Sequence, residues 1–157
     1  MNISANLSII APTVLLGACA TGACATGASA SSNLVVEEKV TINAPASKVW
    51  AKAGNFGDLG AFHPAVAKTE ITSGTNNTKG ALRLLTLGDG GTVNETLSSY
   101  AAGMSYAYVI NESVLPVSNY SAKIMVKPVS ANVSEVMWNA NFKRKDLSAS
   151  PAKGQDD

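Results

Sequence analysis

The chain has 157 residues, of which 46% are hydrophobic and 15% charged, and its formal net charge at pH 7 is +1. This length suits one domain plus a targeting segment, since domains usually hold about 100 to 150 residues, and the apolar content excludes a disordered chain. Basic and acidic residues nearly balance, 12 against 11. Because no run of basic residues could neutralise a row of phosphates, nucleic acid is not an expected partner.

Residues 1–30 are predicted to be an export leader. They contain no charged side chain, and an apolar stretch at 7–16 is followed by small residues. About ten apolar residues are too few to span a bilayer, which needs about 20, but they suit a signal peptide. Two processing routes stay open: LGAC, ending at Cys19, resembles the acylation site of bacterial lipoproteins, and ASA at 28–30 suits ordinary signal peptidase. We expect an exported, periplasmic protein, bound to a membrane only through a lipid on Cys19.

The domain that follows, residues 34–157, contains no cysteine, because Cys19 and Cys24 both lie in the leader. Its stability therefore cannot depend on an internal disulfide. His63 is the only histidine, and one histidine with scattered carboxylates does not make a metal site. We expect neither a metal nor a cofactor.

The first expected elements of the domain are a strand and a short helix. LVVEEKVTIN at 34–43 is rich in β-branched residues and is followed by Pro45. Because proline favours the first turn of a helix, a helix should begin near Pro45 and end near Gly54. Its buried face would hold Val49, Trp50 and Ala53.

A second helical turn and six more strands are expected next. The turn is predicted at 57–63, and Pro64 then releases the chain into an extended segment. The six strands, each rich in β-formers and bounded by turn residues, are predicted at 65–72, 81–87, 92–100, 105–112, 120–128 and 135–143. Such a succession forms an antiparallel meander. Asp89-Gly90 indicates a tight hairpin that needs positive φ.

Four segments, in this order and spacing, resemble a known family: VTINAPASKVWAKAGNFGDLGAFHPAV, LTLGDGGTVNETL, LPVSNYSAKIMV and VMWNANF. The chain is similar over 35–142 to the bacterial polyketide cyclase/dehydrase branch of the SRPBCC superfamily, which includes the START and Bet v 1-like domains. This resemblance implies an α+β helix-grip fold. A seven-stranded curved antiparallel sheet with two short helices after its first strand would grip a long C-terminal helix, leaving a cavity for a small hydrophobic molecule.

The end of the chain departs from that pattern. Residues 147–157 read LSASPAKGQDD, which is too poor in apolar residues, and too rich in proline and glycine, to form the amphipathic helix of the family. At about 25 cal/mol per Å², several hundred Å² of uncovered apolar sheet would cost as much as the whole stability of a domain. We therefore expect that the domain is incomplete at its C-terminus. Otherwise the exposed face must bind a partner, dimerise or collapse.

The candidate ligand-binding residues begin with Glu95, which alternation places on the same side of its strand as Val93 and Leu97. The family is distantly similar to plant abscisic-acid receptors. That similarity implies that Glu95 contacts ligand through water, that Lys68 meets an acidic group of the ligand and that Tyr120 lines the pocket. A buried Lys–Glu pair is costly unless it is satisfied. The alternative is that Glu95 and Lys68 lie on the solvated outer face.

Three more residues complete the ligand-binding set: Phe62, His63 and Tyr106. Phe62 and Tyr106 suit either the core or a pocket wall. His63 has a side chain that titrates near neutral pH and suits a general base, so it joins Glu95 and Tyr120 as a candidate catalytic residue. No motif supplies an acid/base partner, which favours a structural role for His63.

Three functions stay open. Binding or carriage of a small hydrophobic ligand needs only an apolar cavity and one or two polar anchors. A cyclase- or dehydratase-type enzyme would hold a reactive polyketide and move protons on it. The third is docking on a periplasmic protein partner of a dehydrogenase system, implied by a similarity within the branch to the periplasmic accessory proteins of bacterial methanol oxidation.

Overall fold

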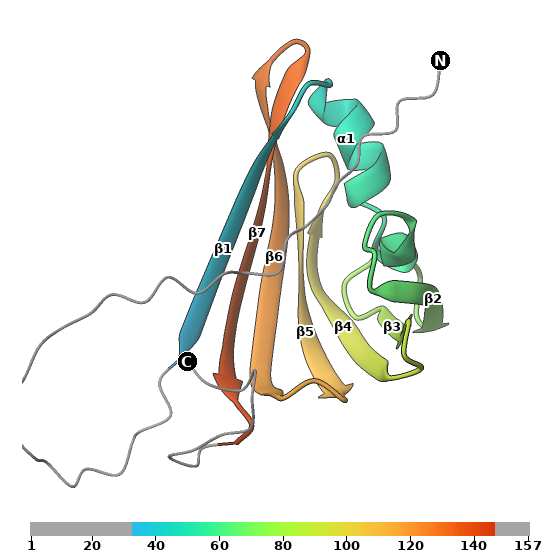
Figure 1. Cartoon of the computed structure of the whole chain (residues 1–157). Helices are drawn as coiled ribbons and strands as arrows, with labels where there is room; N and C mark the ends of the chain where they lie inside the picture. Colours follow the sequence, from blue (N-terminus) through green and yellow to red (C-terminus); the bar gives the residue numbers. More distant parts are fainter. Residues whose placement is uncertain (1–32, 147–157) are drawn as a thin grey trace, which may run out of the picture.

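The computed structural model describes residues 33–146, which form a curved sheet with two short helices on its concave side (Figure 1). The elements in chain order are β1 (Leu34–Ile42), α1 (Ala46–Ala53), the 3-10 helix η1 (Phe56–Ala61), β2 (Val66–Ser73), β3 (Leu82–Leu87), β4 (Thr92–Ala101), β5 (Ser105–Ser113), β6 (Val117–Ser130) and β7 (Val133–Arg144). This confirms the predicted order of elements. The leader, both cysteines and residues 147–157 lie outside the described residues.

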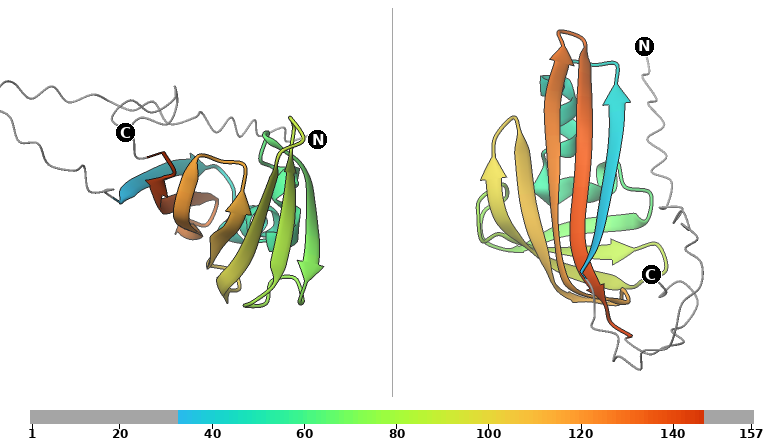
Figure 2. Two further views of the ribbon diagram at one scale, coloured as in Figure 1. Left: turned by 90° about the horizontal axis from the view of Figure 1, so that it is seen from below. Right: turned by 90° about the vertical axis from the view of Figure 1, so that its left-hand side faces the viewer.

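All seven strands belong to one antiparallel sheet, in the order β1-β7-β6-β5-β4-β3-β2. Strands β2 to β6 each pair with the next strand in the chain, whereas β1 pairs with β7, with Leu34 opposite Phe142. The segment with α1 and η1 therefore connects the two edges of the sheet and lies within its curve (Figure 2). We call this concave side the inner face and the convex side the outer face.

Helix α1 begins directly after Pro45 and ends at Gly54, whose backbone N–H donates to the Trp50 carbonyl. A β carbon at Gly54 would lie only 2.2 Å from the Trp50 ring, so glycine lets the chain turn against the indole. On its buried side α1 packs Val49 and Ala53 against Val126 of β6. The predicted buried face of this helix is confirmed for Val49 and Ala53, and Trp50 is half-buried.

The turn between β3 and β4 has the predicted hairpin chemistry. Gly90 has a φ of 87°, which glycine adopts without strain. The Asp89 carboxylate accepts a bond from the Gly91 N–H at 2.9 Å, and the Leu87 N–H closes the turn on the Gly91 carbonyl at 2.8 Å. The turn thereby sets which residues of β3 and β4 face each other.

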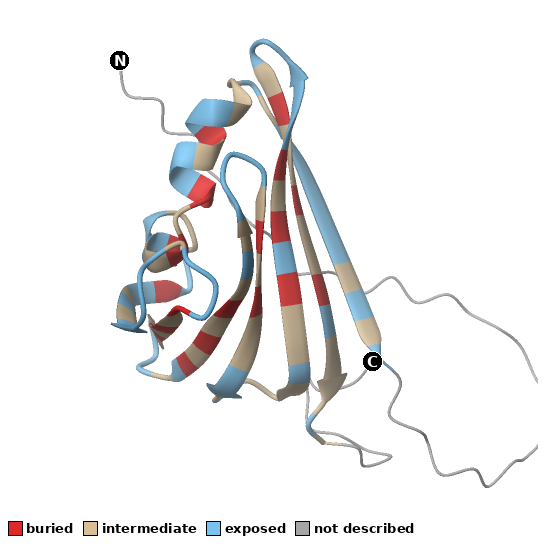
Figure 3. Cartoon of the chain, turned by 180° about the vertical axis from the view of Figure 1, so that it is seen from behind, coloured by how far each residue is buried: buried red, intermediate tan, exposed pale blue. Residues whose placement is uncertain are grey.

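The core lies on the inner face, where alternate residues of the central strands are buried (Figure 3). Its largest cluster consists of Phe56, Ala81, Leu97, Tyr106, Tyr108, Ala122, Ile124 and Ala140. Within residues 33–146 no helix follows β7, so α1 and η1 are the helices that cover the inner face in the described part of the chain. No helix of this part is long and apolar enough to cross a membrane. The domain has the curved sheet and paired short helices of the Bet v 1-like helix-grip fold.

Candidate functional site

A buried ion pair lies on the inner face between β3 and β4. Arg83 and Glu95 are opposite each other in the register of these strands, and Arg83 Nε donates to Glu95 Oε2 at 2.6 Å. Arg83 is fully buried and Glu95 is 3% exposed. Removing a charge from water is costly unless an opposite charge compensates it, so each side chain requires the other.

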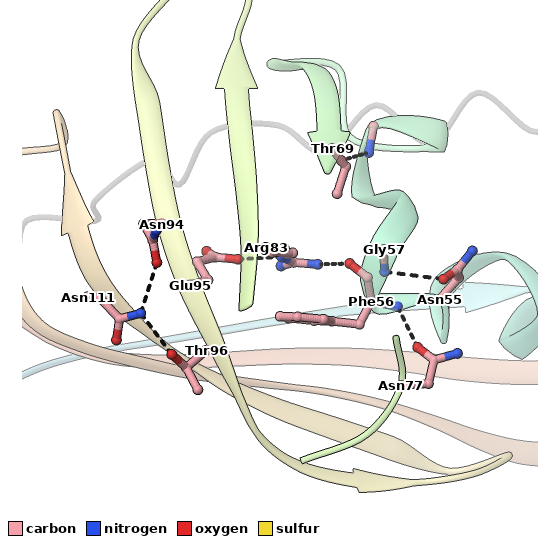
Figure 4. A network of polar contacts seen from close by, with 11 residues as sticks. Asn55, Phe56, Gly57, Thr69, Asn77, Arg83, Asn94, Glu95, Thr96 and Asn111 are labelled. Atoms are coloured by element: carbon pink, nitrogen blue, oxygen red, sulfur yellow. Dashed lines mark hydrogen bonds and ion pairs between the residues drawn. The ribbon is translucent and has the colours of Figure 1, made fainter. Parts of the chain in front are cut away.

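The guanidinium of Arg83 also holds η1 against the sheet. Its Nη1 donates to the Phe56 carbonyl at 2.7 Å, and its central carbon lies 4.1 Å from the centre of the Phe56 ring and 5.0 Å from that of Tyr108. The Phe56 N–H in turn donates to Asn77 Oδ1 at 2.9 Å. Figure 4 shows Arg83 between the Glu95 carboxylate and the η1 backbone.

Three side chains on or beside the inner face carry a buried polar atom that makes no hydrogen bond within the described structure: Arg83 Nη2, the Tyr106 hydroxyl and His63 Nδ1. An unsatisfied buried donor or acceptor costs about 1 to 3 kcal/mol. Such atoms in a native protein therefore indicate a place for a water molecule or a ligand.

Aromatic rings form a continuous row along the inner face. Trp50 of α1 lies 6.3 Å from Tyr106, Tyr106 lies 6.1 Å from Tyr108, Tyr108 lies 6.3 Å from Tyr120, and Tyr120 stacks on Phe142 at 5.8 Å, measured between ring centres. The row crosses β5, β6 and β7, and its Tyr108 ring lies 5.0 Å from the central carbon of Arg83. Tyr120 and Phe142 are only half-buried, so part of their surface is open to a bound molecule.

His63 lies just after η1 and packs edge-on against Trp138 of β7, with 5.7 Å between ring centres. Burial lowers the pKa of His63, and the positive charge of Arg83 lowers it further. The imidazole is therefore neutral at pH 7 and has one nitrogen that can accept a proton. Phe62 beside it is half-buried and packs against the cluster of Leu59, Val66, Leu85 and Val93.

The ionisable groups of the inner face are shifted mainly by burial. Burial raises the pKa of Glu95, and the charge and hydrogen bond of Arg83 oppose that rise. Burial also raises the pKa values of Tyr106, Tyr108 and Tyr120. All three tyrosines therefore keep their hydroxyl protons at neutral pH and can donate hydrogen bonds.

The structure brings most of the candidate residues together. Glu95 and Tyr106 lie in the buried cluster, Tyr120 lies in the aromatic row, and His63 and Phe62 lie near Trp138. Lys68 does not join them: its side chain is 62% exposed and pairs with Glu70 Oε1 at 2.9 Å. Of the two placements left open for Lys68, its exposure agrees with the solvated outer face and not with a contact in the pocket. Lys68 lies on the side of β2 opposite Thr69 and Ile71, which face the core.

Arg83 is the functional candidate that the sequence analysis missed. It is a single cation in the apolar segment ALRLLTL, and alternation places it on the same face as Ala81 and Leu85. A charged residue at a core-facing position signals a buried partner. No group of three or more His, Cys, Asp and Glu side chains among residues 33–146 could hold a metal ion.

Comparisons with known proteins agree with this architecture. A sequence model of the family "Polyketide cyclase / dehydrase and lipid transport" matches residues 33–155. XoxI from Bacillus cereus is 28% identical with a TM-score of 0.66, over 73% of this chain and 78% of that one. A Thermobifida fusca protein solved by NMR is 26% identical with a TM-score of 0.62, over 69% of this chain and 72% of that one.

The aromatase/cyclase Zhui of a Streptomyces species shares the fold at 21% identity, with a TM-score of 0.62 over 78% of this chain and 73% of that one. No curated protein matches the chain in sequence.

Proposed function

Because the chain belongs to the polyketide cyclase/dehydrase and lipid transport family, we propose that it binds and carries a small hydrophobic molecule on the inner face of its sheet. The observation that carries the proposal is the aromatic row from Trp50 to Phe142. Its rings lie side by side on four elements, and the half-buried ones offer apolar surface. Covering 100 Å² of such surface contributes roughly 2.5 kcal/mol to binding before the cost of association.

Native mass spectrometry of the protein purified from its own host tests this proposal. We expect a co-purifying hydrophobic molecule, retained less well by Phe142→Ala, which shortens the row at its open end. Val35→Ala is the matched control, because Val35 is 68% exposed and lies on the outer face of β1, beside the position that pairs with Phe142. A stoichiometric protein partner in place of a small molecule would contradict carriage and favour docking on a dehydrogenase system.

A cyclase- or dehydratase-type activity is the second candidate, and His63 is the residue that favours it. Its neutral imidazole has an unpartnered buried nitrogen beside the inner face, as a general base requires. Such a base would remove a proton from the carbon next to a ligand carbonyl, leaving an enolate that regains a proton from solvent.

The test for this activity follows the methyl protons of acetonaphthone by NMR in D₂O. Exchange for deuterium that is faster than in buffer, and is lost in His63→Gln, would support the enzyme. Exchange at the buffer rate would leave carriage as the function.

We also propose that the protein acts outside the cytoplasm, on the strength of the apolar stretch at 7–16 and the small residues after it. The mass of the mature N-terminus tests this proposal. A chain that begins at an acylated Cys19 is a lipoprotein, a chain that begins at Ser31 is a released periplasmic protein, and an intact leader would contradict export.

A further inference from the structure

We propose that Arg83 Nη2 and the Tyr106 hydroxyl form the polar end of the binding site and take an uncharged oxygen acceptor of the ligand, such as a ketone, aldehyde, ester or amide carbonyl. This inference rests on the proposed function, because it specifies the chemistry of the molecule that the inner face binds.

Both groups are donors with no protein acceptor among the described residues. Arg83 uses Nε for Glu95 and Nη1 for the Phe56 carbonyl, which leaves Nη2 unpaired. Arg83 and Tyr106 are both fully buried. Both groups lie beside the Phe56 ring, whose centre is 4.1 Å from the central carbon of Arg83 and 5.9 Å from the centre of the Tyr106 ring. Burial raises the pKa of Tyr106, and the charge of Arg83 and the approach of its guanidinium to the hydroxyl oppose that rise. The two donors therefore belong to one buried cluster, and a carbonyl oxygen with two lone pairs can accept from both.

The charge balance of the cluster selects an uncharged acceptor. The Arg83 cation is already matched by the Glu95 carboxylate at 2.6 Å. A ligand carboxylate would bring a second negative charge into a buried site beside Glu95, with no second cation to compensate it. A hydrocarbon would leave both donors unsatisfied. A neutral carbonyl compound satisfies the donors without adding charge.

The position of Tyr106 also defines the rest of the ligand. Its hydroxyl belongs to the polar cluster, and its ring lies in the aromatic row between Trp50 and Tyr108. A molecule with its carbonyl at the cluster would thus lay its apolar body along the rings. Flat unsaturated bodies pack well against such rings, because offset-stacked and edge-on arrangements are both favourable.

Three naphthalene probes of similar size test the inference on the full chain: acetonaphthone carries a ketone, ethylnaphthalene has no oxygen, and naphthoate is an anion. Calorimetric titration should give about tenfold tighter binding of acetonaphthone than of ethylnaphthalene, the ratio expected from hydrogen bonds that include a charged donor. Naphthoate should bind more weakly than acetonaphthone. The carbonyl stretch of bound acetonaphthone should move to a lower infrared frequency than in hexane.

Tyr106→Phe removes one donor and keeps the ring, and because the hydroxyl has no partner this variant should fold. We expect several-fold weaker binding of acetonaphthone and unchanged binding of ethylnaphthalene. Tyr100→Phe is the matched control: its hydroxyl donates to the Gly54 carbonyl at 3.1 Å, whereas the Arg83 guanidinium donates to Glu95 and to the Phe56 carbonyl. It should keep the preference of the wild type for the ketone.

Three outcomes are distinguishable. If no probe binds the wild type, the proposed function fails. If acetonaphthone and ethylnaphthalene bind equally, the proposed function stands and the carbonyl site is overturned, because water then satisfies the donors. If Tyr106→Phe destabilises the fold without changing the ratio of the two affinities, Tyr106 serves only to support Arg83, and the inference is again overturned.

Discussion

Glu95 carries a charge whose burial Arg83 offsets only in part. The pKa of its carboxyl is raised because the cost of burial exceeds the stabilisation that the guanidinium supplies. Proteins commonly keep such a pair because removing one partner leaves the other charge uncompensated. At this scale the site consists of one ion pair and two unpartnered donors, Arg83 Nη2 and the Tyr106 hydroxyl.

Replacing Glu95 with Gln should show how much the pair contributes. The amide can still accept a bond from Arg83 Nε, but the cation is then buried without a counter-charge, so we expect a loss of about 3 to 5 kcal/mol in the free energy of unfolding. Urea denaturation measures it. Glu70→Gln breaks the exposed Lys68–Glu70 pair and should cost less than about 1 kcal/mol. Equal losses in the two variants would mean that Glu95 is solvated.

His63 should make the stability depend on pH. Its folded-state pKa lies below the usual value of about 6.5, so in acid the unfolded chain takes up this proton before the folded one. The free energy of unfolding should therefore fall as pH decreases from about 7 through 6.5 to the folded pKa. Glu95 acts in the opposite direction: its raised pKa stabilises the fold as pH falls from that value to about 4.3.

The measurement is the unfolding free energy of the wild type and of His63→Gln between pH 7.5 and 5.5. In His63→Gln the free energy of unfolding should decrease less over this pH range than in the wild type. An identical pH dependence in both proteins would show that the imidazole titrates as it does in water.

The sequence could predict that Glu95 faces the core, because alternation along β4 is sufficient for that. Identifying the partner of Glu95 requires the register of β3 against β4. The Asp89-Gly90 turn contains that information, since Arg83 and Glu95 lie at equal separations from Asp89. The sequence analysis followed the similarity to distant receptors, which implies that Lys68 contacts the ligand and says nothing of Arg83. The unpaired state of Arg83 Nη2 depends on where η1 places its backbone, which no local pattern in the sequence specifies.

Among the elements, α1 depends on a close contact at its end. Gly54→Ala would place a methyl group in the Trp50 ring, whose nearest atom is 2.2 Å away. Since the ring would have to move within a packed cluster, we expect a loss of about 1 to 3 kcal/mol in unfolding free energy. Gly88→Ala is the control, because nothing lies within 4 Å of its added carbon. A neutral effect at Gly54 would mean that Trp50 repacks freely.

Strand β1 is an edge that its charges protect. Glu37, Glu38 and Lys39 follow one another along it, and β7 is the one strand it pairs with in the described sheet. Charged residues discourage such an edge from pairing with another chain. Lys39→Val should therefore increase concentration-dependent light scattering. Lys123→Val removes the same charge from β6, a strand paired on both sides, and should leave the light scattering unchanged. Increased scattering in both variants would show that the lost net charge, and not the sheet edge, causes it.

Turn residues predicted most element boundaries, and the exceptions have a physical cause. Strand β6 was expected from Tyr120 but begins at Val117, because the pairing continues through a shift between Ser118 and Ser121. Asn119 has a φ of 51° at that point, which alternation along a strand cannot reveal. The second helix was expected at 57–63 and lies at Phe56–Ala61, where the Asn55 side chain accepts the Gly57 N–H.

At the scale of the whole molecule, stability depends on what covers the inner face. Trp138, Phe142 and Tyr120 pack against the main cluster but remain only partly buried. The curved sheet and helix pair were predictable because turn residues and alternation recur along the entire chain. The sequence could not predict how deeply η1 covers the inner face, because that depends on contacts such as the hydrogen bond from Arg83 to the Phe56 carbonyl.

A ligand that binds only the folded protein should raise its stability by mass action. At a free concentration one hundred times the dissociation constant, the gain is about 2.7 kcal/mol. The melting temperature should therefore rise with acetonaphthone and rise less in Phe142→Ala at equal concentrations. A melting temperature that does not depend on ligand concentration would exclude binding to the native state.

The pairing of β1 with β7 has a consequence for biosynthesis. Leu34 leaves the ribosome long before Phe142, its partner across the sheet. At roughly 5 to 20 residues per second, the interval is on the order of ten seconds. During it the first strand has no sheet to join, and the sheet is completed only when β7 has been synthesised. Strand β1 is therefore the first strand to be made and among the last to be paired.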